Sequence, residues 1–469
     1  MGGAFMEKIK CENMSFSYPA RAAKALSDIT FSLDTGEFCA LIGKSASGKS
    51  TLLKLLKAEL APHGALDGSV TVNGTVGYVG QRAEEGFVSD RVRGELAFSP
   101  TNAGLDGDAV ELLVAETAAY FHLDAKLDAE IRTLSGGEKQ ILSLAAVMIM
   151  KPDVLLLDEP AAQLDPVSAA LFVDILRTMH RDFHTTILMA EHTLEQIFDI
   201  ADSVMLLDGG ALSFKTDKMT ATERLVADNH EMKAALPVKY LDTVFSADDR
   251  AEITGDTVLS AKNLYFAFEK GRDVLCGLNF KVYEHQINAV IGPNACGKST
   301  LLKVLSGVKK PYRGKVKTKD SIAVLPQNVY DLFTRDTCGE EVPFGDVTAR
   351  LGIDGIQDFH PYDIAGGQAQ RLALAKVLHT GADIILLDEP TQGFDCVLKQ
   401  ELAALLFDLC AEGKTIVIVT HDLQFAGDVA DVCAFMSQGR IVAQKAAKPF
   451  FESLHFYTAP LVRLNRNGG

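Results

Sequence analysis

Two short loops place glycine, lysine and serine at the spacing that binds a nucleotide phosphate. GKSASGKST at 43–51 lies between the apolar run FCALI and the helix-like KSTLLKLLKAEL, and GPNACGKST at 292–300 repeats the arrangement after NAVI. Both match Gly-x-x-x-x-Gly-Lys-Ser/Thr, in which backbone N–H groups and a helix start surround the β-phosphate and the lysine adds positive charge. The predicted nucleotide-binding residues are Gly43, Lys44, Ser45, Ala46, Ser47, Gly48, Lys49, Ser50 and Thr51, and Gly292, Pro293, Asn294, Ala295, Cys296, Gly297, Lys298, Ser299 and Thr300.

Acidic pairs that could support phosphate chemistry end two apolar strands, VLLLDEP and IILLDEP. An aspartate at the end of a buried strand can hold Mg²⁺ through water, and the phosphate-loop serine can bind the ion with its hydroxyl. The glutamate that follows is placed to polarise an attacking water as general base. The predicted magnesium-binding residues are Ser50, Gln81, Asp158, Ser299, Gln327 and Asp388, and the predicted catalytic residues are Glu159, His192, Glu389 and His421.

A glutamine and a histidine accompany the phosphate loop and the acidic pair in each half of the chain. Gln81 and Gln327 end strand-like segments, where an amide can reach Mg²⁺ or the attacking water and sense the γ-phosphate. His192 and His421 follow apolar strands and can donate to the departing γ-phosphate. A lone histidine there is usually a cap or a surface residue. Two copies of the whole set, in one order and at nearly constant spacing, exclude that interpretation here.

The elements that position these residues form a repeat of about 250 residues. Strands rich in Val, Ile and Leu alternate with amphipathic helices, which predicts a mainly parallel sheet flanked by helices in each half. The segments after Gln81 and Gln327 show helical patterns and predict an inserted helical subdomain, which is shorter in the second half. We predict a first domain at 6–214, a linker at 215–256, a second domain at 257–449 and a tail at 450–469.

Two further motifs, LSGGEKQ at 134–140 and IAGGQAQ at 364–370, precede the acidic pairs. Phosphate loop, glutamine, LSGG, Asp-Glu and histidine in this order resemble an ATP-binding-cassette (ABC) ATPase, present twice over nearly the whole chain. The resemblance implies an α/β fold of two tandem P-loop NTPase domains, each with an antiparallel β part and an inserted helical subdomain. It also implies ATP hydrolysis with ATP and Mg²⁺ as cofactors. The two cassettes would pair head to tail, with each ATP between one phosphate loop and the other LSGG segment.

The same resemblance implies further nucleotide contacts. In LSGG, a hydroxyl and unobstructed N–H groups at a helix N-terminus would face the other cassette's γ-phosphate. An aromatic residue near the start of each cassette would stack on adenine, with a core aromatic as the alternative. An aspartate after each acidic pair would belong to a loop that crosses to the opposite site. These residues are Ser135, Gly136, Gly137, Ala365, Gly366 and Gly367, then Tyr18 and Phe268, then Asp165 and Asp395.

Three residues depart from the family pattern. Ala46 and Ala295 stand where the phosphate loop usually has a middle glycine, and alanine is harmless there if the backbone needs only negative φ. Ala365 replaces the signature serine, and head-to-tail pairing would direct it to the ATP held by Lys49. We therefore expect unequal sites, with the Lys49 site the weaker. Cys296 lies inside the second loop, so its alkylation is expected to block nucleotide binding.

Composition indicates a cytosolic protein. The 469 residues are 47% hydrophobic and 23% charged, and no apolar run reaches the roughly 20 residues that cross a bilayer. The net charge of −16 and the lack of a basic block argue against nucleic acid as a partner. We expect the chain to lie peripherally on the cytoplasmic face of the cell membrane.

The segment after each glutamine indicates which ABC protein this is. VSDRVRGELAFSP at 88–100 and FTRDTCGEEVPFG at 333–345 are similar to the T-V-x-x-E-x-A-F-G stretch of energy-coupling-factor (ECF-type) importers. The region AEHTLEQ and the tail are similar to the fused members of that family. This resemblance implies an integral-membrane scaffold and a small substrate-binding membrane subunit as partners. The cargo would be a vitamin, a vitamin precursor or a transition-metal ion.

Glu95 and Glu341 are expected to pair with basic residues of the scaffold, or else to be exposed helix glutamates. Two other classes of twin-cassette protein are alternatives. Ribosome-bound translation factors carry long charged arms between cassettes, whereas the segment here is of mixed charge. Fused sugar-importer ATPases typically have a degenerate second phosphate loop, whereas GPNACGKST is intact.

Overall fold

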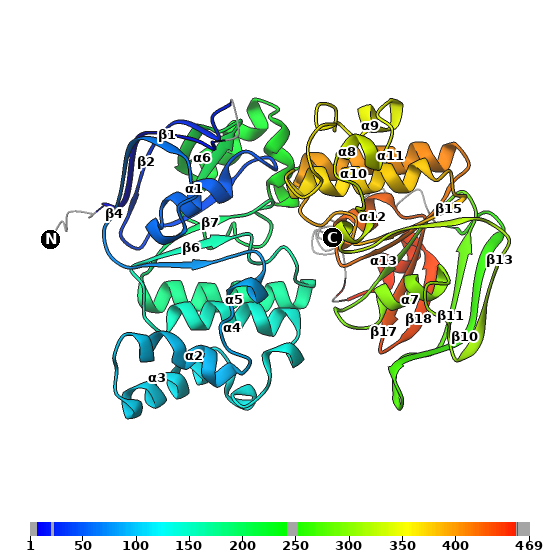
Figure 1. Ribbon diagram of the computed structural model, residues 1–469, viewed down its shortest axis with the longest axis horizontal. Helices are drawn as coiled ribbons and strands as arrows, with labels where there is room; N and C mark the ends of the chain where they lie inside the picture. Colours follow the sequence, from blue (N-terminus) through cyan, green and yellow to red (C-terminus); the bar gives the residue numbers. More distant parts are fainter. Residues whose placement is uncertain (1–6, 20–22, 242–251, 456, 458–469) are drawn as a thin grey trace. The chain divides into compact units, whose positions relative to one another are not determined.

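The computed structural model describes residues 7–19, 23–241, 252–455 and 457 and forms two compact units. The first unit runs to Leu241, and the second contains nearly all of the chain beyond it. Figure 1 shows the elements of both units along the chain. Each unit has its own core, so each is described separately.

The first unit contains a six-stranded sheet of order β5-β6-β7-β3-β8-β9 and a three-stranded antiparallel sheet of order β2-β1-β4. In the larger sheet every pairing is parallel except that of β8 with β9. The strands are β1 (Glu7–Ser17), β2 (Leu26–Asp34), β3 (Phe38–Ile42), β4 (Ala65–Val72), β5 (Val76–Val79), β6 (Val154–Asp158), β7 (Thr186–Ala190), β8 (Ser203–Asp208) and β9 (Ala211–Asp217).

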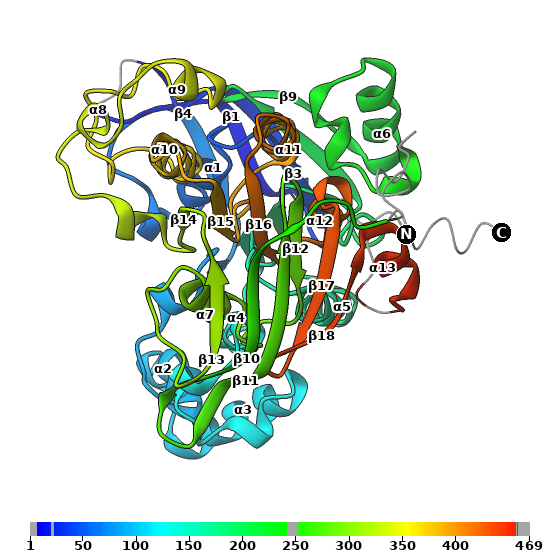
Figure 2. The ribbon, with the colours of Figure 1, turned by 90° about the vertical axis from the view of Figure 1, so that its right-hand side faces the viewer.

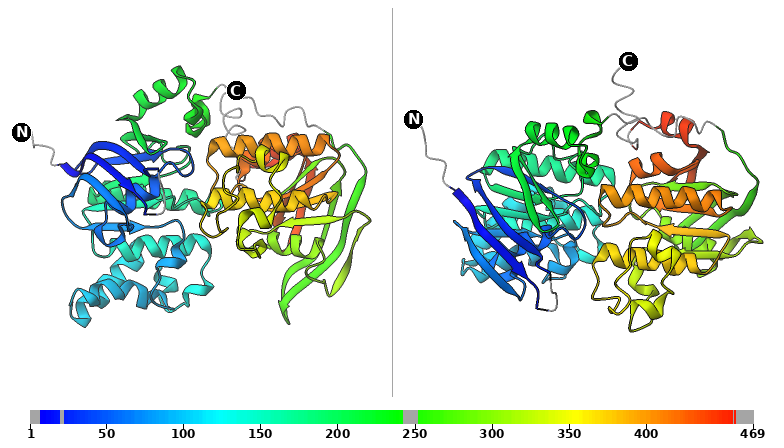
Figure 3. Two further views of the ribbon diagram at one scale, coloured as in Figure 1. Left: turned by 45° about the horizontal axis from the view of Figure 1, so that its top comes forward. Right: turned by 90° about the horizontal axis from the view of Figure 1, so that it is seen from above.

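Helices of the first unit include a pair inserted between β5 and β6. Figure 1 and Figure 3 show α2 and α3 at one end of this unit and β1, β2 and β4 at the other. The α-helices are α1 (Lys49–Leu55), α2 (Val92–Asn102), α3 (Gly107–Tyr120), α4 (Gly136–Met148), α5 (Pro166–Phe183) and α6 (Lys218–Ala227).

The second unit repeats this plan. Figure 2 looks onto its six-stranded sheet, of order β14-β15-β16-β12-β17-β18, and the three-stranded sheet has the order β11-β10-β13. The strands are β10 (Thr257–Glu269), β11 (Arg272–Tyr283), β12 (Ile287–Ile291), β13 (Arg313–Thr318), β14 (Ile322–Leu325), β15 (Ile384–Asp388), β16 (Thr415–Thr420), β17 (Val432–Ser437) and β18 (Arg440–Ala446). The helices are α7 (Lys298–Leu305), α8 (Cys338–Glu341), α9 (Asp346–Arg350), α10 (Gly366–His379), α11 (Cys396–Ala411), α12 (Leu423–Val429) and α13 (Ala447–Ser453).

Both faces of each large sheet are buried. Along β15, Ile385 and Leu387 pack with α10 and α11, whereas Ile384 and Leu386 pack with α7 and the three-stranded sheet. Successive side chains of a strand point to opposite faces, so a strand covered on both sides must be apolar throughout. This is why the runs before the acidic pairs are continuous hydrophobic segments, and the predicted α/β fold class is confirmed.

The segment predicted as a linker, 215–256, is described at 215–241 and 252–256. Met232, Ala235 and Leu236 are buried in the core that contains α4 and α5. The part at 242–251 lies outside the described residues, as does most of the tail, so the domain boundaries stay a prediction. No helix within the described ranges is both long and apolar enough to cross a membrane.

Candidate nucleotide-binding sites

Each phosphate loop joins the end of a central strand to a helix. Lys49 Nζ donates to the carbonyls of Gly43 and Lys44 at 2.9 and 3.2 Å, and Lys298 Nζ to those of Gly292 and Pro293 at 2.9 and 3.0 Å. A Cβ added to Gly43 would lie 2.3 Å from the Leu207 carbonyl oxygen, so only glycine fits there. Both loops therefore have the closed form that presents N–H groups to a phosphate.

Ala46 and Ala295 adopt the left-handed conformation, with φ of 63° and 60°. The condition under which alanine would be harmless, a negative φ, is therefore not met. A Cβ at positive φ approaches the neighbouring backbone, which costs roughly 1–2 kcal/mol relative to the ordinary conformation. The loop keeps the glycine-type geometry in spite of the alanine.

Cys296 in the second loop is buried, and burial raises the pKa of its thiol. Because the thiolate is the form that reacts with alkylating reagents, this environment slows the modification expected from the sequence.

A serine and an aspartate lie together in both cassettes. Ser50 Oγ donates to Asp158 Oδ1 at 3.0 Å, and Ser299 Oγ donates to Asp388 Oδ1 at the same distance. These hard oxygen donors beside the phosphate loop fit Mg²⁺, which keeps several waters and is bound by one or two protein oxygens with the phosphates. Burial raises the pKa of Asp388 to about 6, and burial together with the charge of Glu159 raises that of Asp158. A cation here would relieve that penalty.

Glu159 collects the predicted partners of the first site. Its Oε2 accepts a hydrogen bond from Gln81 Nε2 at 3.2 Å. Its Oε1 lies 2.9 Å from His192 Nε2 and 3.7 Å from Lys49 Nζ. Burial opposes its ionisation, but His192 and Lys49 outweigh burial and hold the pKa of Glu159 below its usual value. The carboxylate is therefore charged and able to accept a proton from water. Its φ of 49° is strained, as is common at functional residues.

The second site resembles the first around its glutamate and histidine but differs at the glutamine. Glu389 Oε2 lies 2.9 Å from His421 Nδ1 and accepts the Thr420 hydroxyl at 3.1 Å, and the φ of Glu389 is 51°. Gln327 is exposed and has no hydrogen bond to another described residue. The structure therefore brings Gln81 to the glutamate of its own site but does not bring Gln327 to Glu389.

Tyr78 belongs to the first site and was not predicted. Its hydroxyl donates to Asp158 Oδ2 at 3.0 Å, so this aspartate is held by a tyrosine and by Ser50. In the parallel register Tyr78 pairs with Leu156, and Val324 pairs with Leu386 at the matching place in the second cassette. The one sequence signal was a tyrosine three residues before Gln81 where the second copy has valine.

The signature motifs begin helices. Ser135 caps α4: its Oγ accepts from the Glu138 N–H at 3.3 Å, and Glu138 Oε2 accepts the Ser135 N–H at 2.8 Å. Ala365 precedes α10 and has no hydroxyl to cap it, so of the two bonds between side chain and backbone seen at Ser135 only one has a counterpart here, from the Ala365 N–H to Gln368 Oε1 at 3.1 Å. A Cβ added to Gly136 or Gly366 would meet nothing within 4 Å of the described atoms. These helix starts are open on that side, as a phosphate-binding N-terminus requires.

The two predicted crossing aspartates also act locally. Asp165 caps α5 and accepts from the N–H groups of Val167 and Ser168, and Asp395 accepts from the Val397 N–H at 2.9 Å. The predicted adenine contacts differ from each other. The Tyr18 hydroxyl lies 3.0 Å from the Thr51 hydroxyl in the phosphate loop, whereas Phe268 is 60% exposed.

Glu95 and Glu341 are buried, and the prediction that they are exposed or free to pair with a scaffold is wrong. Glu95 Oε2 accepts from the N–H groups of Val88 and Ser89 at 3.0 and 2.9 Å. Glu341 accepts from two N–H groups at the corresponding loop and is ion-paired with Lys376. A buried carboxylate with these partners fixes the loop after the glutamine.

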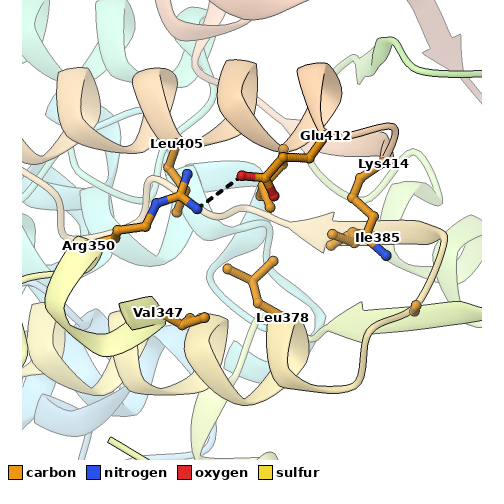
Figure 4. Close-up of a pocket in the computed structure, with 9 residues that line it drawn as sticks. Val347, Arg350, Leu378, Ile385, Leu405, Glu412 and Lys414 are labelled. Atoms are coloured by element: carbon orange, nitrogen blue, oxygen red, sulfur yellow. Dashed lines mark hydrogen bonds and ion pairs between the residues drawn. The ribbon is translucent and has the colours of Figure 1, made fainter. Parts of the chain in front are cut away.

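A pocket of about 130 Å³ in the second unit contains none of the predicted site residues (Figure 4). Leu378 and Leu405 line it beside the ion-paired Arg350 and Glu412, whose nitrogen and oxygen are 3.3 Å apart. Arg350 and Glu412 correspond to Tyr120 and Phe183 of the first unit, whose ring centroids are 5.6 Å apart. An ion pair and an open pocket thus replace aromatic packing.

Comparison with known proteins identifies the family. The sequence model of the ABC transporter family matches residues 26–162 and 275–392, which is more than half of the chain. The chain belongs to the ABC ATPase family. It therefore contains two cassettes that bind ATP with Mg²⁺ and hydrolyse it.

Relatives of similar length support this assignment. A Bacillus anthracis protein predicted to be an ABC transporter ATP-binding protein is 33% identical, over 97% of this chain and 95% of its own length. A Streptomyces coelicolor protein with the same description is 30% identical, over 94% of each chain.

Solved structures share the fold. An RNase-L inhibitor superposes with a TM-score of 0.68 at 21% identity, over 94% of this chain and 93% of its own. The archaeal ribosome recycling factor aABCE1, solved with ribosomal stalk protein aP1, has a TM-score of 0.65 at 21% identity, covering 92% and 90%. At this identity the likeness establishes the tandem-cassette fold alone.

Proposed function

We propose that Glu159 and Glu389 are the general bases of two ATP sites. In the first site, the contacts with His192 and Lys49 keep Glu159 charged beside the phosphate loop. A charged carboxylate within reach of the attacking water can accept its proton as the γ-phosphoryl group transfers. Lys49 and Lys298 place positive charge beside the phosphates. Replacing each glutamate by glutamine and measuring ATP hydrolysis tests this assignment, because glutamine keeps the shape but cannot take the proton.

The remaining assignments follow the same geometry. We propose that Ser50 and Asp158, and likewise Ser299 and Asp388, hold Mg²⁺, because each pair shares a hydrogen bond beside its loop. When bound, Mg²⁺ would neutralise charge on the β- and γ-phosphate oxygens. Head-to-tail pairing of the cassettes would complete each ATP site with the LSGG motif of the other cassette.

We infer that the chain is the energy-coupling ATPase of an ECF-type importer, attached to two membrane subunits. The loop after the glutamine carries this proposal, because it resembles the importer family in sequence and is braced in the same way in both cassettes. Glu95 binds the N–H groups of that loop in the first cassette, and Glu341 does so in the second. Because the two glutamates are buried, other side chains must contact the scaffold. The apolar Val88 and Phe98 are 60% and 47% exposed, and we propose that they contact a scaffold helix.

The alternative is a twin-cassette factor that acts on the ribosome. The two solved structures named above include a ribosome recycling factor, but their likeness extends to the fold alone. The acidic total charge of −16 disfavours an RNA surface as the principal partner.

Purification of the tagged chain from gently solubilised membranes tests the two functions directly. Two small multi-span membrane proteins in the purified complex would support the importer, and the smaller subunit would reveal the cargo. A Val88→Asp/Phe98→Asp variant should lose these subunits but keep ATP hydrolysis. Ribosomal proteins in place of membrane subunits would overturn the proposal.

A further inference from the structure

Glu191 in the first cassette and Thr420 in the second occupy the same place in the fold. Ala190 pairs with Asp158 and accepts the N–H of Glu159 at 3.0 Å, and Glu191 is the next residue. In the second cassette Val419 pairs with Asp388 and accepts the N–H of Glu389 at 2.8 Å, and Thr420 follows it. The register of the two sheets therefore gives Glu191 and Thr420 matching positions, each directly after the residue whose carbonyl accepts the N–H of a proposed base.

Thr420 shows what this position does in the second site. It is fully buried, and its hydroxyl donates to Glu389 Oε2 at 3.1 Å. The same oxygen accepts the backbone N–H of His421 at 3.2 Å. Because a hydroxyl does not titrate near neutral pH, this hydrogen bond is present at every physiological pH.

Glu191 is enclosed with one oxygen unsatisfied. The residue is 7% exposed, the N–H groups of Ala161 and His192 donate to its carboxyl group, and Oε1 has no hydrogen-bond partner among the described residues. Its charged neighbours are Glu159 at the end of β6 and Lys49 on α1, and His192 follows it in the chain. A buried polar atom without a partner is costly, so Oε1 needs an acceptor or a donor within the site.

Two adjacent buried carboxyl groups do not both ionise at neutral pH. Glu159 is the charged member because His192 and Lys49 stabilise it. Burial, reinforced by the charge of Glu159, raises the pKa of Glu191 to about 8. Glu191 therefore holds a proton at neutral pH, and a protonated carboxyl group is a hydrogen-bond donor like the threonine hydroxyl.

We propose that Glu191 is a positioning residue of the first ATP site: its protonated carboxyl group donates to Glu159 as Thr420 donates to Glu389, and its ionisation switches that site off. Ionised Glu191 can no longer donate, and it places a second negative charge beside both Glu159 and the ATP phosphates. The first site would thus lose activity in mild alkali while the second would not. This inference rests on the proposed role of Glu159 as general base.

The test isolates the first site by silencing the second with Glu389→Gln. ATP hydrolysis at saturating ATP is measured from pH 7 to pH 9 with Glu191 retained, with Glu191→Gln and with Glu191→Thr. With Glu191 the rate should fall about tenfold, because the protonated fraction falls by that factor across a pKa of about 8. Both substituted forms carry a non-titrating donor, so their fall should be less than about twofold.

The reciprocal exchange is the matched control. In a Glu159→Gln background, which leaves only the second site, Thr420→Glu should introduce the alkaline fall that the unchanged second site lacks. Equal pH profiles for Glu191, Glu191→Gln and Glu191→Thr would overturn the inference. Full activity of a Glu159→Gln/Glu389→Gln double variant would instead refute the proposed bases themselves, so the two failures are distinguishable.

A measurement that needs no turnover covers the case in which single-site variants are inactive. Native Glu191 binds a proton that the unfolded chain releases above its ordinary pKa, so stability should fall as pH rises toward about 8. Urea unfolding of the full chain at pH 6 and pH 8 should show this loss, and Glu191→Gln should reduce it. The same loss in both proteins would also overturn the inference.

Discussion

Replacing the strained alanines of the phosphate loops by glycine should stabilise each cassette. Ala46 and Ala295 are exposed, so truncation to glycine removes little packing, and their φ values of 63° and 60° lie in the region that disfavours a Cβ. Ala46→Gly changes the first cassette and Ala295→Gly changes the second. Each variant therefore leaves the other cassette as an internal reference.

The expected magnitude is the difference between two opposing terms. Relief of the left-handed conformation should contribute roughly 1–2 kcal/mol. The greater freedom of glycine in the unfolded chain should cost roughly 0.5–1 kcal/mol. The net gain therefore spans roughly 0–1.5 kcal/mol with a midpoint of about 0.75 kcal/mol, which corresponds to a rise of up to roughly 6 °C in Tm for a domain of this size.

Scanning calorimetry without nucleotide measures the effect, because the transition of the altered cassette should move and the other should stay. Ala170→Gly is the matched control: this alanine is exposed within α5, where glycine should cost roughly 1 kcal/mol. Opposite signs for Ala46→Gly and Ala170→Gly are expected. A decrease of the same size in both would show that the loop does not require the left-handed conformation, and the reasoning would be refuted.

Two further predictions concern the unequal ATP sites and the buried ion pair of Glu341 with Lys376. Loss of the signature hydroxyl at Ala365 should weaken the site that holds Lys49 by about 1.5–3 kcal/mol. Glu389→Gln, which silences the other site, should therefore reduce ATP hydrolysis more than Glu159→Gln. A larger loss from Glu159→Gln would contradict head-to-tail asymmetry. Glu341→Gln should destabilise the second cassette by about 1–3 kcal/mol in urea unfolding, because a buried carboxylate loses its charge while its lysine partner keeps its own. The exposed neighbour is the control, and an equal effect of Glu340→Gln would show that the buried ion pair contributes nothing.

Much of the site could be predicted because its parts are contiguous in sequence. A phosphate loop needs eight consecutive residues, and an Asp-Glu pair needs only the apolar strand before it. The strands bring these pieces to one edge of the sheet because parallel strands end together. The hydrogen bonds of Ser50 with Asp158 and of Ser299 with Asp388 follow from that topology.

Other features depended on residues that meet only in the folded chain. Burial of Glu95 and Glu341 could not be inferred from a helix-like stretch, because their partners are backbone N–H groups of an irregular loop and, for Glu341, a lysine 35 residues away. The positive φ of Ala46 contradicts what alanine normally prefers, so residue type pointed the wrong way.

By itself the sequence determined that this protein has two complete ATP-binding cassettes, since local motifs and strand periodicity are written along the chain. Ala365 in the second signature motif already predicted unequal sites, and the tertiary structure decided which further side chains distinguish them. Tyr78 reaches Asp158 in the first, and Glu191 is buried beside Glu159 where Thr420 serves the second. Such differences arise from the pairing register of strands that are distant in sequence. That register decides which side chains are buried next to one another.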